Sequence, residues 1–126
     1  MDLLGKFYNS KGLYDACIGK RAQVTNELVQ LLVEVAHLKG VMDSEYMQTL
    51  ENYSFIDDDV LLEKYLDSEH GNDAKFLCAF LTFIVRKDRF CNGLGFYLVE
   101  LIENGIVSKL IEKMMTAFPI EKQSTQ

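Results

Sequence analysis

The sequence predicts an all-α domain, a compact bundle of five to seven helices packed around a central apolar helix near residues 74–89. Apolar residues recur at helical spacing over most of the chain, glycines separate these stretches, and no segment alternates like a strand. The chain has 126 residues, 48% of them hydrophobic, and one proline. This profile is typical of one soluble domain, which we place at residues 1–118, followed by a frayed polar tail at 119–126.

The first half of the chain contains several amphipathic stretches of moderate length. Residues 1–20 fit one or two short helices, although three glycines interrupt their pattern. From Arg21 to Lys39 the apolar residues fall on one helical face, and Gly40 follows as a natural stop. The next helix begins with Asp43 or Ser44 as its cap and extends to Tyr53.

The second half is more apolar. A helix is expected from the aspartates at 57–59 to Gly71, because acidic residues stabilise the positive end of a helix dipole. The central helix, from Ala74 to about Arg89, contains the longest apolar run and is too short to cross a bilayer, which needs about 20 residues. Two more helices are expected near 94–102 and 107–118.

Charge is concentrated in one part of the chain. The net charge is −6, which argues against a general nucleic-acid binder and against binding to an anionic membrane. Eight acids against one base give residues 51–73 a net charge of −7. One interpretation is an ordinary solvated helix face. The other is a surface that docks on a basic protein partner, formed by Asp57, Asp58, Asp59, Glu63, Asp67 and Glu69.

The docking interpretation suggests a regulatory protein, for example a phage-type inhibitor of a basic, nucleic-acid-binding partner, or an antitoxin-like protein. A homo-oligomer is a further hypothesis, because Lys6, Lys11, Lys20 and Arg21 give the N-terminal segment the opposite charge. We expect no metal site here, because Asp59 and Glu63 are two carboxylates only and the segment does not match a calcium loop.

Arg86 and Arg89 lie three residues apart near the end of the central helix, so they share one side of it. With the turn amides near Asn92 and Gly93 they could bind a small anion or a nucleotide, which is our alternative functional hypothesis. The structural interpretation of the same residues has Arg89 pairing with Glu100 or Glu103 of the next helix. In that interpretation Phe90 packs into the core.

The cysteines Cys17, Cys78 and Cys91 are odd in number and widely spaced, which is typical of a reduced intracellular protein rather than a disulfide framework. We expect Cys78 to be a core residue and the protein to be cytoplasmic, since no signal peptide precedes the first helix. Cys91 has basic neighbours that could activate its thiol. Neither His37 nor His70 is close to it in sequence, however, and we expect no thiol catalysis.

The segment 86–93 has the pattern R-x-[DE]-R-F-C-[DN]-G and is followed by Glu103 and Gly105. It resembles a small bacterial or phage helical family of unknown function, over roughly residues 74–115. The resemblance implies a helical, bacterial or phage-borne protein, without a known catalytic or ligand role.

No phosphate-binding loop, metalloprotease motif or nucleophile elbow occurs in the chain. The sequence therefore favours a non-enzymatic protein-interaction or regulatory module without a cofactor.

Overall fold

The computed structural model describes residues 2–90 and 95–120, and within these residues the protein is all-α, as predicted. No strand occurs in the described part of the chain. Three short 3-10 helices cover Arg21–Gln23, Asp59–Leu61 and Glu69–Asn72. The α-helices are α1 (Leu3–Asn9), α2 (Lys11–Asp15), α3 (Asn26–Ala36), α4 (Tyr46–Asn52), α5 (Leu62–Asp67), α6 (Ala74–Phe90), α7 (Phe96–Glu103) and α8 (Ile106–Ala117).

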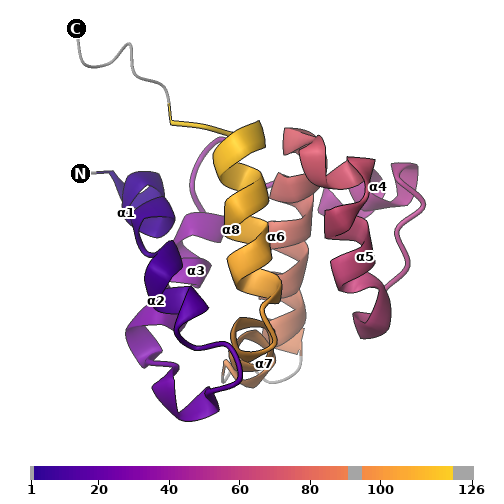
Figure 1. Cartoon of the computed structure of the whole chain (residues 1–126). Coiled ribbons are helices and arrows are strands. Elements are labelled where there is room, and N and C mark those ends of the chain that lie inside the picture. The colour runs from indigo at the N-terminus through magenta and orange to yellow at the C-terminus, as the bar shows by residue number, and fades with distance from the viewer. Residues whose placement is uncertain (1, 91–94, 121–126) are drawn as a thin grey trace, which may run out of the picture.

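The helices are arranged around α6, which lies in the middle of the bundle beside α8 (Figure 1). Helices α1, α2 and α3 lie on one side of this pair, and α4 and α5 lie on the other. Helix α7 packs across the end at which α6 terminates. The central helix predicted at 74–89 is therefore confirmed.

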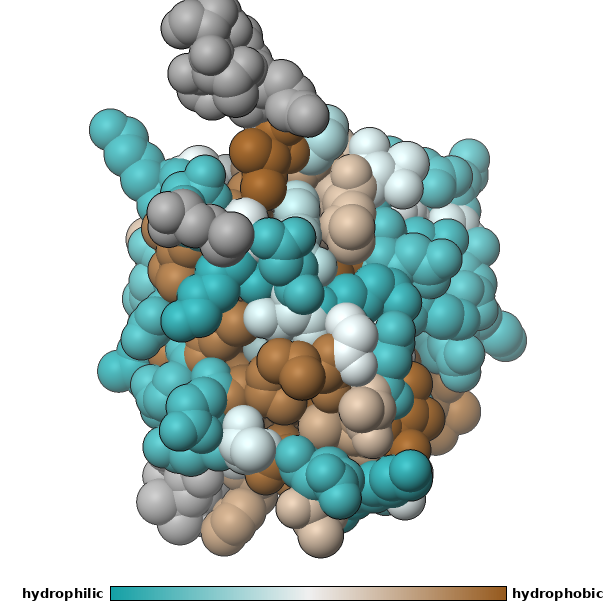
Figure 2. Space-filling view, turned by 60° about the vertical axis from the view of Figure 1, so that its left-hand side comes forward, coloured by the Kyte–Doolittle hydropathy of each residue, from teal (hydrophilic) through white to brown (hydrophobic). Residues whose placement is uncertain are grey.

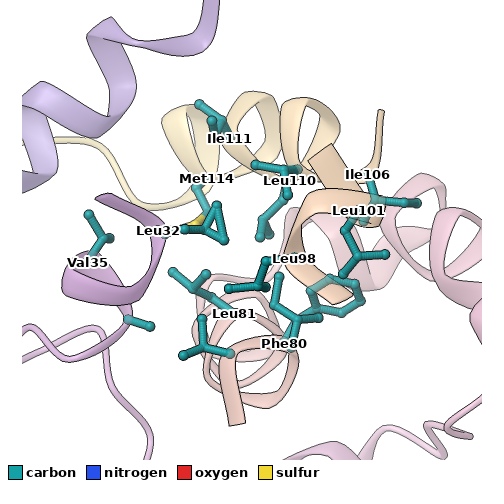
Figure 3. Packing of buried hydrophobic residues seen from close by; sticks show 14 of the residues in the cluster. Leu32, Val35, Phe80, Leu81, Leu98, Leu101, Ile106, Leu110, Ile111 and Met114 are labelled. Atoms are coloured by element: carbon teal, nitrogen blue, oxygen red, sulfur yellow. The ribbon is translucent and has the colours of Figure 1, made fainter. Parts of the chain in front are cut away.

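The core forms where the apolar faces of α3, α6, α7 and α8 meet (Figure 3). Leu81 of α6 and Leu98 of α7 are fully buried there, and Leu32 of α3 and Leu110 of α8 are equally buried. Ten of the 17 residues of α6 are buried. This burial on most sides explains why its sequence is a nearly continuous apolar run rather than a single stripe.

Helix boundaries differ from the sequence prediction where polar side chains compete for backbone groups. The helix expected from Arg21 begins only at Asn26, because Thr25 is extended and its hydroxyl accepts a hydrogen bond from the Leu28 N–H at 3.3 Å. The helix ends at Ala36, before the predicted stop at Gly40. The described residues contain eight α-helices, one above the expected range, because the first 20 residues form two separate helices, α1 and α2.

The acidic segment also differs from the single helix expected between 57 and 71. It consists of a 3-10 turn, the six-residue α5 and a second 3-10 turn. The Asp58 carboxylate accepts from the Val60 N–H and the Ser68 hydroxyl accepts from the His70 N–H, so each side chain caps one of the short turns. Gly71 is buried against the backbone of Leu66, where a side chain would not fit.

Candidate partner-binding groove

A groove of about 760 Å³ lies between α4 and the C-terminal half of α6. Helix α4 and the residues before it contribute one wall, α6 contributes the other, and Phe55 lies between them. We call this feature the α4/α6 groove. It is lined by Ser44, Glu45, Tyr46, Met47, Gln48, Leu50, Glu51, Phe55, Asp57, Phe83, Lys87 and Phe90.

The α6 wall arises from a simple helical register. Phe83, Lys87 and Phe90 are four and then three residues apart, so they project from one face of the helix. The Phe83 ring packs on the Phe55 ring at a centroid distance of 5.1 Å, which closes the floor. Phe90, about two turns beyond Phe83, is 82% exposed. The α6 wall of the groove is thus covered at Phe83 and is exposed and apolar at Phe90.

The α4 wall repeats this combination of covered and exposed apolar side chains. Tyr46 and Leu50 are buried one helical turn apart, whereas Met47 is 71% exposed. Exposed apolar side chains also occur elsewhere, including Leu13 of α2 at 61%, and Figure 2 shows brown apolar surface interspersed with teal on another face. Exposure alone therefore does not define a site. The α4/α6 groove combines two such side chains with concavity and a closed aromatic floor.

The lining of the groove is acidic. Three carboxylates, those of Glu45, Glu51 and Asp57, face one ammonium group, that of Lys87, which gives the lining a net charge of −2. Neither glutamate forms an ion pair with any residue that the structure describes. Two carboxylates of this lining are therefore available to a partner.

Lys87 is already engaged by the protein itself. Its ammonium group lies 2.8 Å from the Asp57 carboxylate and 3.4 Å from that of Asp59, and 4.8 Å from the centroid of the Tyr97 ring. Partial burial lowers the pKa of Lys87, but the hydrogen bond and charge of Asp57, together with Asp59, more than offset this and raise the pKa above 10.5. The Lys87 ammonium group thus holds the 57–59 segment against α6 through these ion pairs.

The acidic surface predicted at 57–69 is present but partly neutralised. Lys109 of α8 lies 2.9 Å from Glu63 and 2.7 Å from Asp67, and these hydrogen bonds raise its pKa. With the two aspartates held by Lys87, four of the six predicted acids form ion pairs within the chain. The other two, Asp58 and Glu69, are exposed. Sequence composition could not reveal this pairing, because the lysines come from distant helices.

The structure does not bring Arg86 and Arg89 together over a described cavity. The Arg86 guanidinium lies over the ring of Tyr46, a lining residue of the groove, at 5.6 Å from its centroid. Arg89 is exposed, and neither arginine lines the groove. Asn92 and Gly93, the other residues of the proposed anion site, lie outside the described residues, as does Cys91.

The structural role predicted for Arg89 and Phe90 is wrong. Among the described residues Arg89 forms no ion pair with Glu100 or Glu103, and Glu103 pairs with Arg21 at 3.0 Å. Phe90 is exposed rather than packed in the core. Asp88 makes the connection instead. Its buried carboxylate accepts hydrogen bonds from the N–H groups of Gly95, Tyr97 and Leu98, at 3.1, 3.1 and 3.3 Å, at the start of α7. The buried polar side chain that connects α6 to α7 is thus Asp88, which is adjacent in sequence to Arg89, the residue predicted for this role.

Cys17 and Cys78 are buried free thiols, as expected for Cys78. Burial raises the pKa of both, to about 11 for Cys78. Within residues 2–90 and 95–120, no group of three or more potential metal ligands occurs, and no helix combines the length and apolarity needed to cross a membrane.

The α4/α6 groove is a candidate site that sequence reasoning missed. One signal was available, namely the spacing of Phe83, Lys87 and Phe90 on a helix otherwise occupied by core residues. The α4 wall could not be assigned to the same site, because it lies more than 30 positions earlier in the chain.

Comparison with known proteins identifies a family but no activity. The family model described as a family of unknown function (DUF6508) matches residues 18–118. Neither a curated protein nor a solved structure matches the chain.

Proposed function

We propose that this chain, which belongs to the family of unknown function DUF6508, is a non-enzymatic interaction module that binds a basic protein partner in its α4/α6 groove. The observation that carries this proposal is the position of two exposed apolar side chains, Met47 and Phe90, on the walls of an acidic groove. Large apolar side chains on a concave, charged surface are typical of the anchor positions of protein interfaces.

This proposal shifts the expected docking site from the acidic segment to the adjacent groove. Most carboxylates between 57 and 69 are held by lysines of α6 and α8, which lowers the charge that they offer to a partner. Glu45 and Glu51 carry their charge on exposed positions of the groove instead. Regulation of a basic, nucleic-acid-binding protein, in a bacterial or phage setting, stays a hypothesis within this proposal.

The test is selection of peptides from a displayed random library on the full chain. We expect enriched peptides that no longer bind the Phe90→Ser or Met47→Gln chains and that still bind the Leu13→Ser chain. Leu13 is the matched control because it is an exposed apolar residue of α2, on the opposite side of α6. Failure to enrich any peptide, or binding that survives Phe90→Ser, would contradict the proposed function.

A further inference from the structure

We infer that the occupant of the α4/α6 groove is a short amphipathic helix of a second protein, with basic residues flanking its apolar stripe. This inference rests on the proposed function and names the class of partner for the same site. Three features of the groove support it, namely its construction from helices, its length and its charge.

The construction of the groove favours a helix over an extended peptide. Extended peptides commonly bind by adding a strand to a sheet edge, and no strand exists among the described residues to provide one. The walls instead present side chains from α4 and α6, with an aromatic floor between them. Such a surface recognises a ligand through side-chain contacts, which is how an amphipathic helix binds in a groove.

The length of the groove matches an occupant of about two helical turns. At a rise of about 1.5 Å per residue, the seven residues of α4 span about 10 Å. The seven steps from Phe83 to Phe90 on the other wall span the same distance of about 10 Å. A partner helix can place apolar side chains at positions i, i+4 and i+7 over this length, so two or three anchors can be accommodated.

The charge of the groove indicates basic residues on the partner. Glu45 and Glu51 are exposed on the lining and unpaired within the described residues, whereas the one cation, Lys87, is compensated by Asp57 and Asp59. Lysine or arginine flanking the apolar stripe would therefore be attracted to the rim, and an acidic helix would be repelled.

A second copy of the chain fits this site poorly. The whole chain has a net charge of −6, and the groove of a second copy would bring the same glutamates to the interface. Two of the N-terminal basic residues considered for head-to-tail association are already paired, Lys11 with Asp15 and Arg21 with Glu103. The charge distribution thus favours a different protein as the partner.

The experiment uses fluorescein-labelled synthetic peptides of 15 residues, each with leucine at positions i, i+4 and i+7. One peptide carries lysines beside the leucines, its pair carries glutamates there, and a third carries the lysines and a central proline. Binding to the full chain is measured by fluorescence anisotropy. We expect the lysine peptide to bind, and the other two peptides to bind at least about tenfold more weakly. Added salt should weaken the binding of the lysine peptide.

Variants of the chain separate groove binding from general attraction to an acidic protein. Phe90→Ser is expected to weaken binding of the lysine peptide by about tenfold, and Leu13→Ser is expected to leave this binding unchanged. The double variant Glu45→Lys/Glu51→Lys should reverse the preference between lysine and glutamate peptides. Equal binding of both peptides, or lysine-peptide binding that is insensitive to Phe90→Ser, would overturn the inference.

Failure of this inference is distinguishable from failure of the proposed function. If the displayed peptides depend on Phe90 and are basic but bind equally well with a central proline, the function stands and the helical form of the partner is wrong. If the Phe90-dependent peptides are acidic, the basic partner of both proposals is wrong. If no peptide shows dependence on Phe90, both are wrong.

Discussion

The carboxylate of Asp88, near the end of α6, accepts a hydrogen bond from the backbone N–H of Tyr97 in the first turn of α7 at 3.1 Å. The same side chain also binds the N–H groups of Gly95 and Leu98. Helix α7 therefore begins on a capping residue supplied by another helix. Because Asp88 is one residue after Lys87, this connection also positions the α6 wall of the groove.

The Asp88→Asn chain is expected to lose about 1–3 kcal/mol of unfolding free energy. The asparagine side chain has one acceptor oxygen where the aspartate has two. Its NH2 group would face the Gly95 N–H, which would be left buried without an acceptor. Urea denaturation measures the change. Glu112→Gln is the matched control, because it removes an exposed carboxylate of α8. Equal stability of the two variants would show that the Asp88 cap is dispensable.

Gly71→Ala is expected to be strongly destabilising, whereas Gly12→Ala is expected to be neutral or stabilising by up to about 1 kcal/mol. A methyl group at Gly71 would overlap the backbone carbonyl of Leu66, whereas one at Gly12 meets no atom within 4 Å. Thermal melting of the two variants, monitored by circular dichroism, makes the comparison. A Gly71→Ala chain that melts like the wild type would mean that the turn after α5 adjusts freely.

Acidification should weaken the contact between Tyr53 and Asp73. The Tyr53 hydroxyl donates to the Asp73 carboxylate at 2.5 Å, and this hydrogen bond lowers the pKa of Asp73 below its usual 3.8. Because the pKa of Asp73 is depressed in the folded state, the stabilisation is complete above about pH 5, declines as the pH falls past the unfolded-state value of about 4, and is lost as the pH falls through the folded-state value.

Tyr53→Phe should therefore flatten the fall in unfolding free energy between pH 5 and pH 3, as measured by urea denaturation at each pH. Tyr65→Phe is the control, because the Tyr65 hydroxyl accepts from the Ile56 N–H and contacts no carboxylate in the described residues. Parallel pH profiles for the wild type and Tyr53→Phe would contradict the assignment.

Lys109→Gln is expected to lower the unfolding free energy by less than about 1 kcal/mol, and high salt should reduce the loss. Lys109 pairs with Glu63 and Asp67, which are both more than half exposed, so the ion pairs are screened by solvent. At 1 M salt the Debye length falls to about 3 Å. Lys113→Gln, at a position of α8 without an ion pair in the described residues, is the control. A loss that is unchanged at 1 M salt would indicate a packing role for the Lys109 stem.

The fold was predictable because its strongest signal is local. The apolar run around Leu81 and the amphipathic faces of α3 and α8 lie within single segments, so helical periodicity identifies them directly. The boundaries of α3 and of the acidic helices were not predictable in the same way. They depend on individual capping bonds, such as that of Thr25, which compete with helix extension.

The candidate site was less predictable because it depends on contacts between distant residues. The neutralisation of Asp57 by Lys87 spans 30 positions, and that of Glu63 by Lys109 spans 46. The local sequence shows that these residues are acidic, but it cannot show which lysine forms an ion pair with each of them. The arginines of the 86–93 motif were conspicuous for their charge, whereas Asp88 between them makes the buried connection.

Methyl NMR of the full chain labelled with 13C-methyl methionine tests the central claim most directly. Of its five methionines, Met47 lines the groove, whereas Met42, Met114 and Met115 lie elsewhere in the described structure. Titration with the lysine-flanked peptide should shift the Met47 signal, assigned with Met47→Leu, and leave those three unchanged. Shifts at Met42 or Met115 with an unperturbed Met47 would contradict the assignment of the α4/α6 groove as the partner-binding site.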